Sequence, residues 1–173
     1  MPDPSGQGLT FIIGGARSGK SAHAEKLVTA RPGPWTYIAT AEAYDDEMAE
    51  RIAVHRVRRG AGWTTVDAPL DLAQALRTVP DDRPVLIDCL TLWLSNHMLA
   101  EHDIDALSAE LEEVLASPRG PWFVVSNEVG MGIVPDNRLA RRFRDAQGRL
   151  NQRVAACADR VLFLVAGLPL QVK

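Results

Sequence analysis

Short apolar runs alternate along the chain with segments in which apolar residues recur at helical spacing. The runs are rich in β-branched and aromatic residues and predict strands at 9–13, 35–40, 63–66, 84–88, 121–126 and 161–165. The intervening segments predict helices at 21–29, 45–59, 70–76, 90–99, 105–116 and from about 137 onward. Strands that are apolar throughout and alternate with helices are typical of a parallel sheet covered on both faces. We therefore expect an α/β fold with a mostly parallel central sheet, in a single domain over 9–173.

The two ends of the chain differ from this regular pattern. Residues 1–8 are polar and rich in Pro and Gly, without the features of a signal peptide, and we expect a flexible tail there. The last long helix is strongly amphipathic, and arginines occupy much of its polar side. Its apolar face is predicted to carry Leu139, Phe143, Leu150, Val154 and Cys157. After the last core strand, a short tail has room to pair at an edge of the sheet.

A phosphate-binding motif connects the first predicted strand to the first predicted helix. It follows the pattern Gly, four residues, Gly, Lys and then Ser or Thr, and reads Gly14-Gly15-Ala16-Arg17-Ser18-Gly19-Lys20-Ser21. Its glycines let successive N–H groups point into one concavity, to which the helix N-terminus adds partial positive charge. Lys20 is expected to reach the β- and γ-phosphates, and the Ser21 hydroxyl to hold Mg²⁺. A chance glycine turn is the alternative, but strand, loop and helix in this order indicate a P-loop NTPase-type three-layer fold that binds a nucleoside triphosphate.

Asp88 is a second candidate for the nucleotide site, because it ends the compact apolar strand 84–88. In P-loop enzymes a carboxylate in such a place organises Mg²⁺, directly or through a water molecule. The alternative is a capping role at the N-terminus of the helix that begins at Leu90. Ligands in parallel sheets lie beyond the carboxyl ends of the strands, where both Asp88 and the P-loop are expected.

His55 is the most discriminating residue of the predicted helix 45–59. Its spacing from Met48 and Ile52 places the three on one face, which by itself favours a half-buried core histidine. Its neighbours in sequence fit either a solvated helix face or a site that neutralises a triphosphate; they are Arg51, Arg56, Arg58 and Arg59. Nearby cations favour the neutral, nucleophilic imidazole, so the second interpretation is a histidine that attacks a phosphorus atom.

Composition limits the other classes of function. The 173 residues are 46% hydrophobic and 24% charged, with a formal net charge of −3, so nothing attracts the whole chain to nucleic acid or to an anionic membrane. No apolar run approaches the roughly 20 residues that span a bilayer. Cys89 and Cys157 lie far apart in apolar patterns, which favours buried free thiols in a reducing cytoplasm over a disulfide or a metal site. We expect a cytoplasmic protein with no nucleic-acid and no membrane partner.

Further segments of the chain, taken together, resemble one enzyme family. They comprise Tyr37-Ile38-Ala39-Thr40; Asp45-Asp46-Glu47-Met48 with Arg51-Ile52, His55 and Trp63; and Asn127-Glu128-Val129-Gly130-Met131-Gly132-Ile133-Val134-Pro135, continuing through Asn137-Arg138 to Asn151-Gln152-Arg153. With the P-loop, they are similar to the bifunctional adenosylcobinamide kinase/adenosylcobinamide-phosphate guanylyltransferases of cobalamin biosynthesis. The resemblance extends from Leu9 to Val165, and the His55 block and the Asn127–Pro135 segment carry it most specifically.

That resemblance implies two reactions and a set of site residues. A nucleoside triphosphate, ATP or GTP with Mg²⁺, phosphorylates adenosylcobinamide; GTP then donates GMP through His55 to the new phosphate. Homotrimers are also implied. The implied nucleotide contacts are Gly14 to Ser21, Ala39, Thr40, Ala41, Arg56, Val57, Arg58, Arg59 and Asp67. Ala41, Val57 and Asp67 depart from the family's commonest residues at their positions.

Three other interpretations fit parts of the sequence. A plain small-molecule kinase explains the P-loop and Asp88 but leaves the His55 block unexplained. A regulatory GTPase would need a base-reading Asn-Lys-x-Asp type segment, which the sequence lacks. For a nucleic-acid-dependent ATPase, the sequence offers only the basic face of the last helix, which is local. The segment Asn127–Pro135 suits close backbone approach, a mobile lid or an ordered turn at a subunit contact.

Overall fold

Strands and helices alternate along the chain nearly as the apolar pattern predicts. The computed structural model describes residues 7–42 and 59–173. Within them the strands are β1 (Gly8–Gly14), β2 (Trp35–Ala39), β3 (Trp63–Asp67), β4 (Val85–Asp88), β5 (Pro121–Asn127), β6 (Arg160–Val165) and β7 (Leu168–Gln171). The helices are α1 (Lys20–Thr29), α3 (Leu72–Thr78), α4 (Leu90–Leu99), α5 (Ile104–Leu115) and α6 (Arg138–Cys157). The predicted helix 45–59 lies almost wholly outside the described residues.

All the described strands join one sheet in the order β3-β2-β4-β5-β1-β6-β7. Every neighbouring pair is parallel except β6 and β7, which pair antiparallel through Leu162↔Gln171 to Val165↔Leu168. The C-terminal tail therefore pairs at an edge, and the predicted mostly parallel sheet is confirmed. The order also separates β1 from β4 by one strand, β5, which the local sequence pattern does not reveal.

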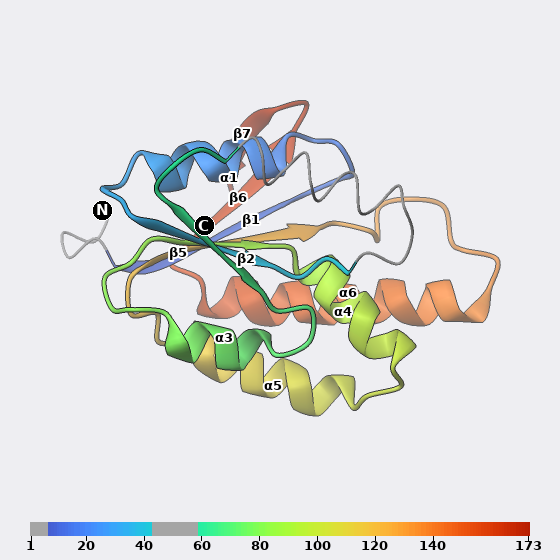
Figure 1. Ribbon diagram of the computed structural model, residues 1–173. Coiled ribbons are helices and arrows are strands. Elements are labelled where there is room, and N and C mark those ends of the chain that lie inside the picture. Colours follow the sequence, from blue (N-terminus) through green and yellow to red (C-terminus); the bar gives the residue numbers. More distant parts are fainter. Residues whose placement is uncertain (1–6, 43–58) are drawn as a thin grey trace.

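Helices cover both faces of the sheet and form three layers with it (Figure 1). In that view α1 lies on one side, and α3, α4, α5 and α6 lie on the other. Neighbouring residues of one strand pack into different hydrophobic cores. Phe11 packs toward the α3–α6 side and Ile12 toward α1, and both are fully buried. Because both faces of each central strand are buried, these strands are apolar throughout rather than alternating. None of the described helices is long and apolar enough to cross a membrane.

Helix α6 departs from its predicted apolar face. Leu139 is 52% exposed, whereas Gln147 and Asn151 are buried. These two side chains bond to each other and to Ser126 of β5: Gln147 Nε2 donates to Ser126 Oγ at 3.0 Å, and Ser126 Oγ donates to Asn151 Oδ1 at 2.8 Å. These hydrogen bonds offset the cost of burying the polar groups that make them, whereas Gln147 Oε1 is buried without a hydrogen-bond partner among the described residues. The core of this helix thus includes polar residues, and the prediction for Leu139 is wrong.

The two cysteines also differ in burial. Both are free thiols, as predicted, but Cys89 is buried while Cys157 is only half-buried. Burial raises the pKa of the Cys89 thiol to about 11, with the negative charge of Asp88 acting in the same direction. Cys89 is therefore a protonated, unreactive core residue at neutral pH.

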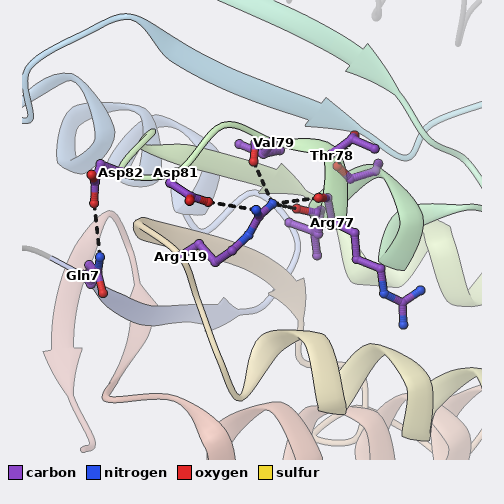
Figure 2. Close-up of polar contacts among 9 residues, drawn as sticks. Gln7, Arg77, Thr78, Val79, Asp81, Asp82 and Arg119 are labelled. Atoms are coloured by element: carbon purple, nitrogen blue, oxygen red, sulfur yellow. Dashed lines mark hydrogen bonds and ion pairs between the residues drawn. The ribbon is translucent and has the colours of Figure 1, made fainter.

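Arg119 connects two segments at the end of the sheet opposite the carboxyl ends of the parallel strands (Figure 2). Its Nη2 donates to the carbonyl oxygens of Arg77 and Val79, both at 2.7 Å, and to that of Leu76 at 3.3 Å. Its Nη1 pairs with Asp81 at 2.8 Å. The guanidinium thus supplies donors to carbonyls that the end of α3 leaves without helical partners. It joins the α3–β4 connection to the α5–β5 connection.

Candidate nucleotide-binding site

The carboxyl ends of the parallel strands bring the predicted site residues to one edge of the sheet. Ala39 at the end of β2 lies opposite Asp67 of β3 on one side and opposite Asp88 of β4 on the other. Gly14 at the end of β1 lies opposite Asn127 of β5. The P-loop, Asp88 and Asp67 are therefore at the same edge of the sheet, as expected for a ligand site of a parallel sheet.

Two glycines are required by the shape of the P-loop. A Cβ on Gly14 would lie 2.6 Å from the Leu164 carbonyl oxygen and 2.8 Å from Ser18 Oγ, so no side chain fits there. Gly19 has φ +92°, a left-handed conformation that favours glycine. Within the loop the Ser18 N–H donates to the Gly15 carbonyl at 3.3 Å. The loop thus doubles back directly before α1.

The N-terminus of α1 follows the loop and adds to its positive potential. Its N-cap is Gly19, which has no side chain to accept from the first helical N–H groups. Helices α5 and α6, by contrast, are capped by the side chains of Asp103 and Asn137. No acidic residue lies in the first turn of α1 either. An anion at this end would meet backbone donors and the positive end of the helix dipole.

Lys20 is buried beneath the loop and turned toward it. Its Nζ donates to the Gly15 carbonyl at 2.6 Å, and Ser18 Oγ lies 3.5 Å away. Burial lowers the pKa of Lys20, while nearby Cys89 and Asp88 oppose that shift by favouring the ammonium. The charges of Lys20, at the start of α1, and Asp88, at the end of β4, are thus close enough to influence each other, although β5 lies between β1 and β4. The P-loop and the end of β4 form one site.

Tyr37 is a site residue that sequence reasoning missed. Its hydroxyl donates to Asp88 Oδ2 at 3.2 Å, and the Arg59 guanidinium carbon lies 3.4 Å from the centre of its ring. Burial raises the pKa of Tyr37 well above its ordinary value, and the neighbouring Asp88 charge adds to this, so the hydroxyl stays protonated and donates. Only the pairing of β2 with β4 brings Tyr37 to Asp88, so no local signal would have found it.

The predicted metal ligands have suitable chemistry for Mg²⁺. The Asp88 carboxylate and the Ser21 hydroxyl are oxygen donors, which hard cations prefer, and both belong to the edge that holds Lys20. The described part of the chain contains no cluster of three or more His, Cys, Asp or Glu side chains that could hold a metal ion.

The remaining predicted contacts are distributed as follows. Thr40 is fully buried, and its hydroxyl bonds both backbone groups of Cys89, accepting from N–H at 2.8 Å and donating to the carbonyl at 2.6 Å. Ala41 follows it half-buried, and Asp67 ends β3. The N-cap of α4 is Cys89, so the structure does not give that position to Asp88. Four of the predicted contacts lie outside the described residues: His55, Arg56, Val57 and Arg58.

The fold and the loop define the class: a P-loop nucleotide-binding protein. A solved protein of Pyrococcus horikoshii, PH0250, is similar with TM-score 0.55 and 10% identity, over 96% of this chain and 86% of that one. A prototypical ATPase of a bacterial type III secretion system is similar with TM-score 0.53 and 11% identity, over 95% of this chain and 56% of that one. At such identities the likeness shows the fold alone.

The family is narrower than the class. The sequence model of the family "Cobinamide kinase / cobinamide phosphate guanyltransferase" matches residues 10–172, and the chain belongs to this family. It is 48% identical to the bifunctional adenosylcobalamin biosynthesis protein CobP of Pseudomonas aeruginosa, over 94% of this chain and 96% of that protein. It is 43% identical to CobU of Salmonella typhimurium, described by the same words, over 95% and 99% of the two chains. The resemblance found in the sequence motifs is confirmed.

Proposed function

We propose that this protein phosphorylates adenosylcobinamide with ATP or GTP and then transfers GMP from GTP to adenosylcobinamide phosphate, giving adenosylcobinamide-GDP. Membership in the cobinamide kinase / cobinamide phosphate guanyltransferase family carries the proposal. The geometry supports it, because the P-loop, Lys20 and Asp88 meet at one edge of the sheet. Both reactions are attacks at phosphorus, for which charge neutralisation and alignment are the main requirements.

Different residues at the P-loop edge are proposed to bind the phosphates, neutralise their charge and hold Mg²⁺. The loop Gly14–Ser21 and the N-terminus of α1 bind the phosphates, and the Lys20 ammonium neutralises the outer ones. Asp88, held by the Tyr37 hydroxyl, and Ser21 would hold Mg²⁺, which supplies further neutralisation of the phosphates when bound. Ala39, Thr40, Ala41, Asp67 and the segment Arg56–Arg59 are proposed nucleotide contacts from the family resemblance. For Thr40 the contact rests on the family resemblance alone, because the residue is fully buried, its hydroxyl bonds Cys89, its N–H donates to the Asp88 carbonyl at 3.3 Å and its carbonyl accepts from Asn96 Nδ2 at 2.8 Å.

His55 is the proposed carrier of GMP. A neutral ring nitrogen attacks the α-phosphorus of GTP; a nitrogen–phosphorus bond forms, the bond to the β-phosphate oxygen breaks, and pyrophosphate leaves. An oxygen of adenosylcobinamide phosphate then attacks the same phosphorus and breaks the nitrogen–phosphorus bond. Because His55 lies outside the described residues, this role rests on its sequence block and on the family resemblance.

Labelled GTP tests the proposal. With label at the α-phosphate, the wild-type protein is expected to form an acid-labile, base-stable adduct, and His55→Ala is expected to form none while keeping much of its kinase activity. Lys20→Ala is expected to depress both activities, because both use the P-loop. An adduct on the His55→Ala protein would contradict the histidine assignment. Transfer of a γ-phosphate by a wild type that forms no α-labelled adduct would leave a plain P-loop kinase.

We also propose a cytoplasmic homotrimer with no nucleic-acid partner. The two free thiols support a reducing compartment. Exposed apolar side chains on β7 and directly after it support a subunit contact at that edge, since Leu168, Leu170 and Val172 are 60 to 72% exposed. Light scattering coupled to gel filtration tests the trimer, and a monomer at micromolar concentration would contradict it. DNA binding that persists at physiological salt would contradict the proposed absence of a nucleic-acid partner.

A further inference from the structure

A cavity of about 480 Å³ lies on the side of the P-loop formed by β5 and β6. Three segments line it: Gly15 and Ser18 of the P-loop, residues of the stretch 128–132 after β5, and residues 163–166 at the end of β6. Among the described residues, the nucleotide contacts proposed on β2 and β3 and Arg59 do not line it. It opens next to the phosphate loop.

Hydrogen bonds fix the segments beside this cavity to the P-loop. The Glu128 N–H donates to the Gly14 carbonyl at 2.9 Å. On the other side, the Gly167 N–H donates to the Ser18 carbonyl, also at 2.9 Å. A molecule in the cavity is therefore held at a constant place relative to phosphates bound by the loop.

Glu128 is the one ionisable side chain among the described residues that line the cavity. Its Oε1 accepts from the Gly130 N–H at 2.8 Å and its Oε2 from the Met131 N–H at 3.0 Å. These bonds fold the segment 128–131 into a turn and orient the carboxylate. A carboxylate has about four lone-pair sites, so each oxygen keeps the capacity to accept from a hydroxyl as well.

The wall and mouth of the cavity are apolar. Val129, Phe163 and Leu164 line it, and so do Met131 and Val165, which are 79% and 53% exposed. Beyond Met131 the same segment exposes Ile133 at 98% and Val134 at 59%. Apolar side chains gathered in this way mark a binding surface rather than an ordinary solvated loop. A triphosphate gains nothing from such walls, whereas a large organic molecule with apolar surface and a hydroxyl does.

We propose that this cavity is the acceptor site, in which the hydroxyl arm of adenosylcobinamide lies against Glu128 and its ring system packs on Met131, Ile133 and Val134. This inference rests on the proposed function. In the kinase step the acceptor oxygen bonds to the γ-phosphorus and its proton passes to the Glu128 carboxylate. The bond between the γ-phosphorus and the β–γ bridging oxygen breaks, and the electron pair leaves with the nucleoside diphosphate.

The chemistry of Glu128 is tested by Glu128→Gln, with Glu113→Gln, an exposed residue of α5, as the matched control. Phosphate transfer from γ-labelled ATP to adenosylcobinamide is expected to fall about 100-fold or more in kcat for Glu128→Gln, the usual effect of losing a proton acceptor. The acidic limb of the pH–rate profile should disappear with it, which a purely structural role would not cause. Labelling of the protein by α-labelled GTP needs no acceptor and should proceed as in the wild type. A near-wild-type kcat for Glu128→Gln would overturn the assignment, and so would a parallel loss of GTP labelling.

The apolar wall is tested by Met131→Ser, with Leu99→Ser at the 61%-exposed end of α4 as control. Because both side chains are exposed, both variants should fold. Met131→Ser is expected to raise KM for adenosylcobinamide at least tenfold and to leave KM for ATP within twofold. A change in oligomer mass would instead assign the segment to a subunit contact and overturn the inference.

These experiments distinguish a failure of the proposed function from a failure of the proposed acceptor site. If the wild type neither phosphorylates adenosylcobinamide nor accepts label from GTP, the proposed function is wrong. If the wild type does both and the Glu128 and Met131 variants match their controls, the proposed function stands and only the acceptor site is wrong.

Discussion

Tyr37 and Asp88 are joined across neighbouring strands, because the Tyr37 hydroxyl of β2 donates to Asp88 Oδ2 of β4 at 3.2 Å. The Arg59 guanidinium carbon lies over the ring of the same tyrosine, 3.4 Å from the ring centre. Burial and the Asp88 charge hold the pKa of the hydroxyl high, so it remains a donor at every physiological pH. The carboxylate that is proposed to help hold Mg²⁺ is thus oriented by a residue outside the P-loop motif.

Replacement of Tyr37 by Phe tests that orientation. The ring stays available to Arg59, and the bond from the hydroxyl to Asp88 is lost. Hydrogen bonds to charged groups contribute about 1.5–3 kcal/mol, so we expect roughly a tenfold or greater rise in the Mg²⁺ concentration that half-saturates ATP turnover. A titration of turnover with Mg²⁺ at constant ATP measures it. An unchanged Mg²⁺ dependence would show that Tyr37 serves only the core.

Replacement of Arg119 by Ala is expected to destabilise the protein without changing its kinetics. The three carbonyls at the end of α3 lose their donor, at a cost of about 1–3 kcal/mol in the free energy of unfolding. The carboxyl-end site is at the opposite edge of the sheet, so KM for ATP should not move. Asp81→Asn is the control, because its ion pair with Arg119 is largely exposed and contributes little. Urea unfolding measures both variants, and equal effects of the two would contradict the carbonyl-capping role.

Stability is expected to fall as the pH drops below neutral, in part through His97. This ring is 3% exposed; its Nδ1 lies 2.8 Å from His102 Nδ1, and its Nε2 lies 3.1 Å from the Leu70 carbonyl. Burial lowers the pKa of His97, the Leu70 carbonyl and Asp71 oppose the shift, and His102 adds to it. Below about pH 6.5 the unfolded chain takes up a proton that the folded chain resists.

The contribution of His97 is present above that pH and is lost as the pH falls, with a slope of at most about 1.4 kcal/mol per pH unit. Urea unfolding between pH 7.5 and 5.5 measures the slope. The slope should be shallower in His97→Gln. His23, whose pKa is also lowered by burial, contributes in the same direction and remains in that variant. A slope that is the same in both proteins would contradict a role for His97.

Replacement of Gly148 by Ala is expected to stabilise the protein. Gly148 lies inside α6, and a Cβ there would meet nothing within 4 Å. Glycine within a helix costs about 0.5–1 kcal/mol relative to alanine, so the free energy of unfolding should rise by that amount. Gly14→Ala is the opposite case, because its Cβ would lie 2.6 Å from the Leu164 carbonyl oxygen. Thermal unfolding measures the stability of both variants. A destabilised Gly148→Ala protein would contradict the prediction that a Cβ fits at position 148.

The helices, the strands and the P-loop could be predicted from the sequence because their signals are local. The predicted helix 90–99 coincides with α4, and the strand 121–126 is one residue shorter than β5. For α6, by contrast, the 3.6-residue period selected Leu139 but not Gln147 or Asn151. Those two are buried because they meet Ser126 of β5, a partner some twenty residues away in the chain. Periodicity reports which face is apolar, and it does not report which polar groups find partners inside.

The sequence by itself determined the alternation of strands and helices, the phosphate loop and the family, since each depends on which residues follow one another along the chain and not on how they pack. Only the tertiary structure decided that β5 lies between β1 and β4, that Tyr37 bonds Asp88, and that Glu128 lies beside the P-loop. Strand order depends on how apolar faces pack over the whole sheet, and a parallel sheet gathers its strand ends whatever their distance along the chain. Contacts between those ends therefore follow from the packed fold and from no single stretch of residues.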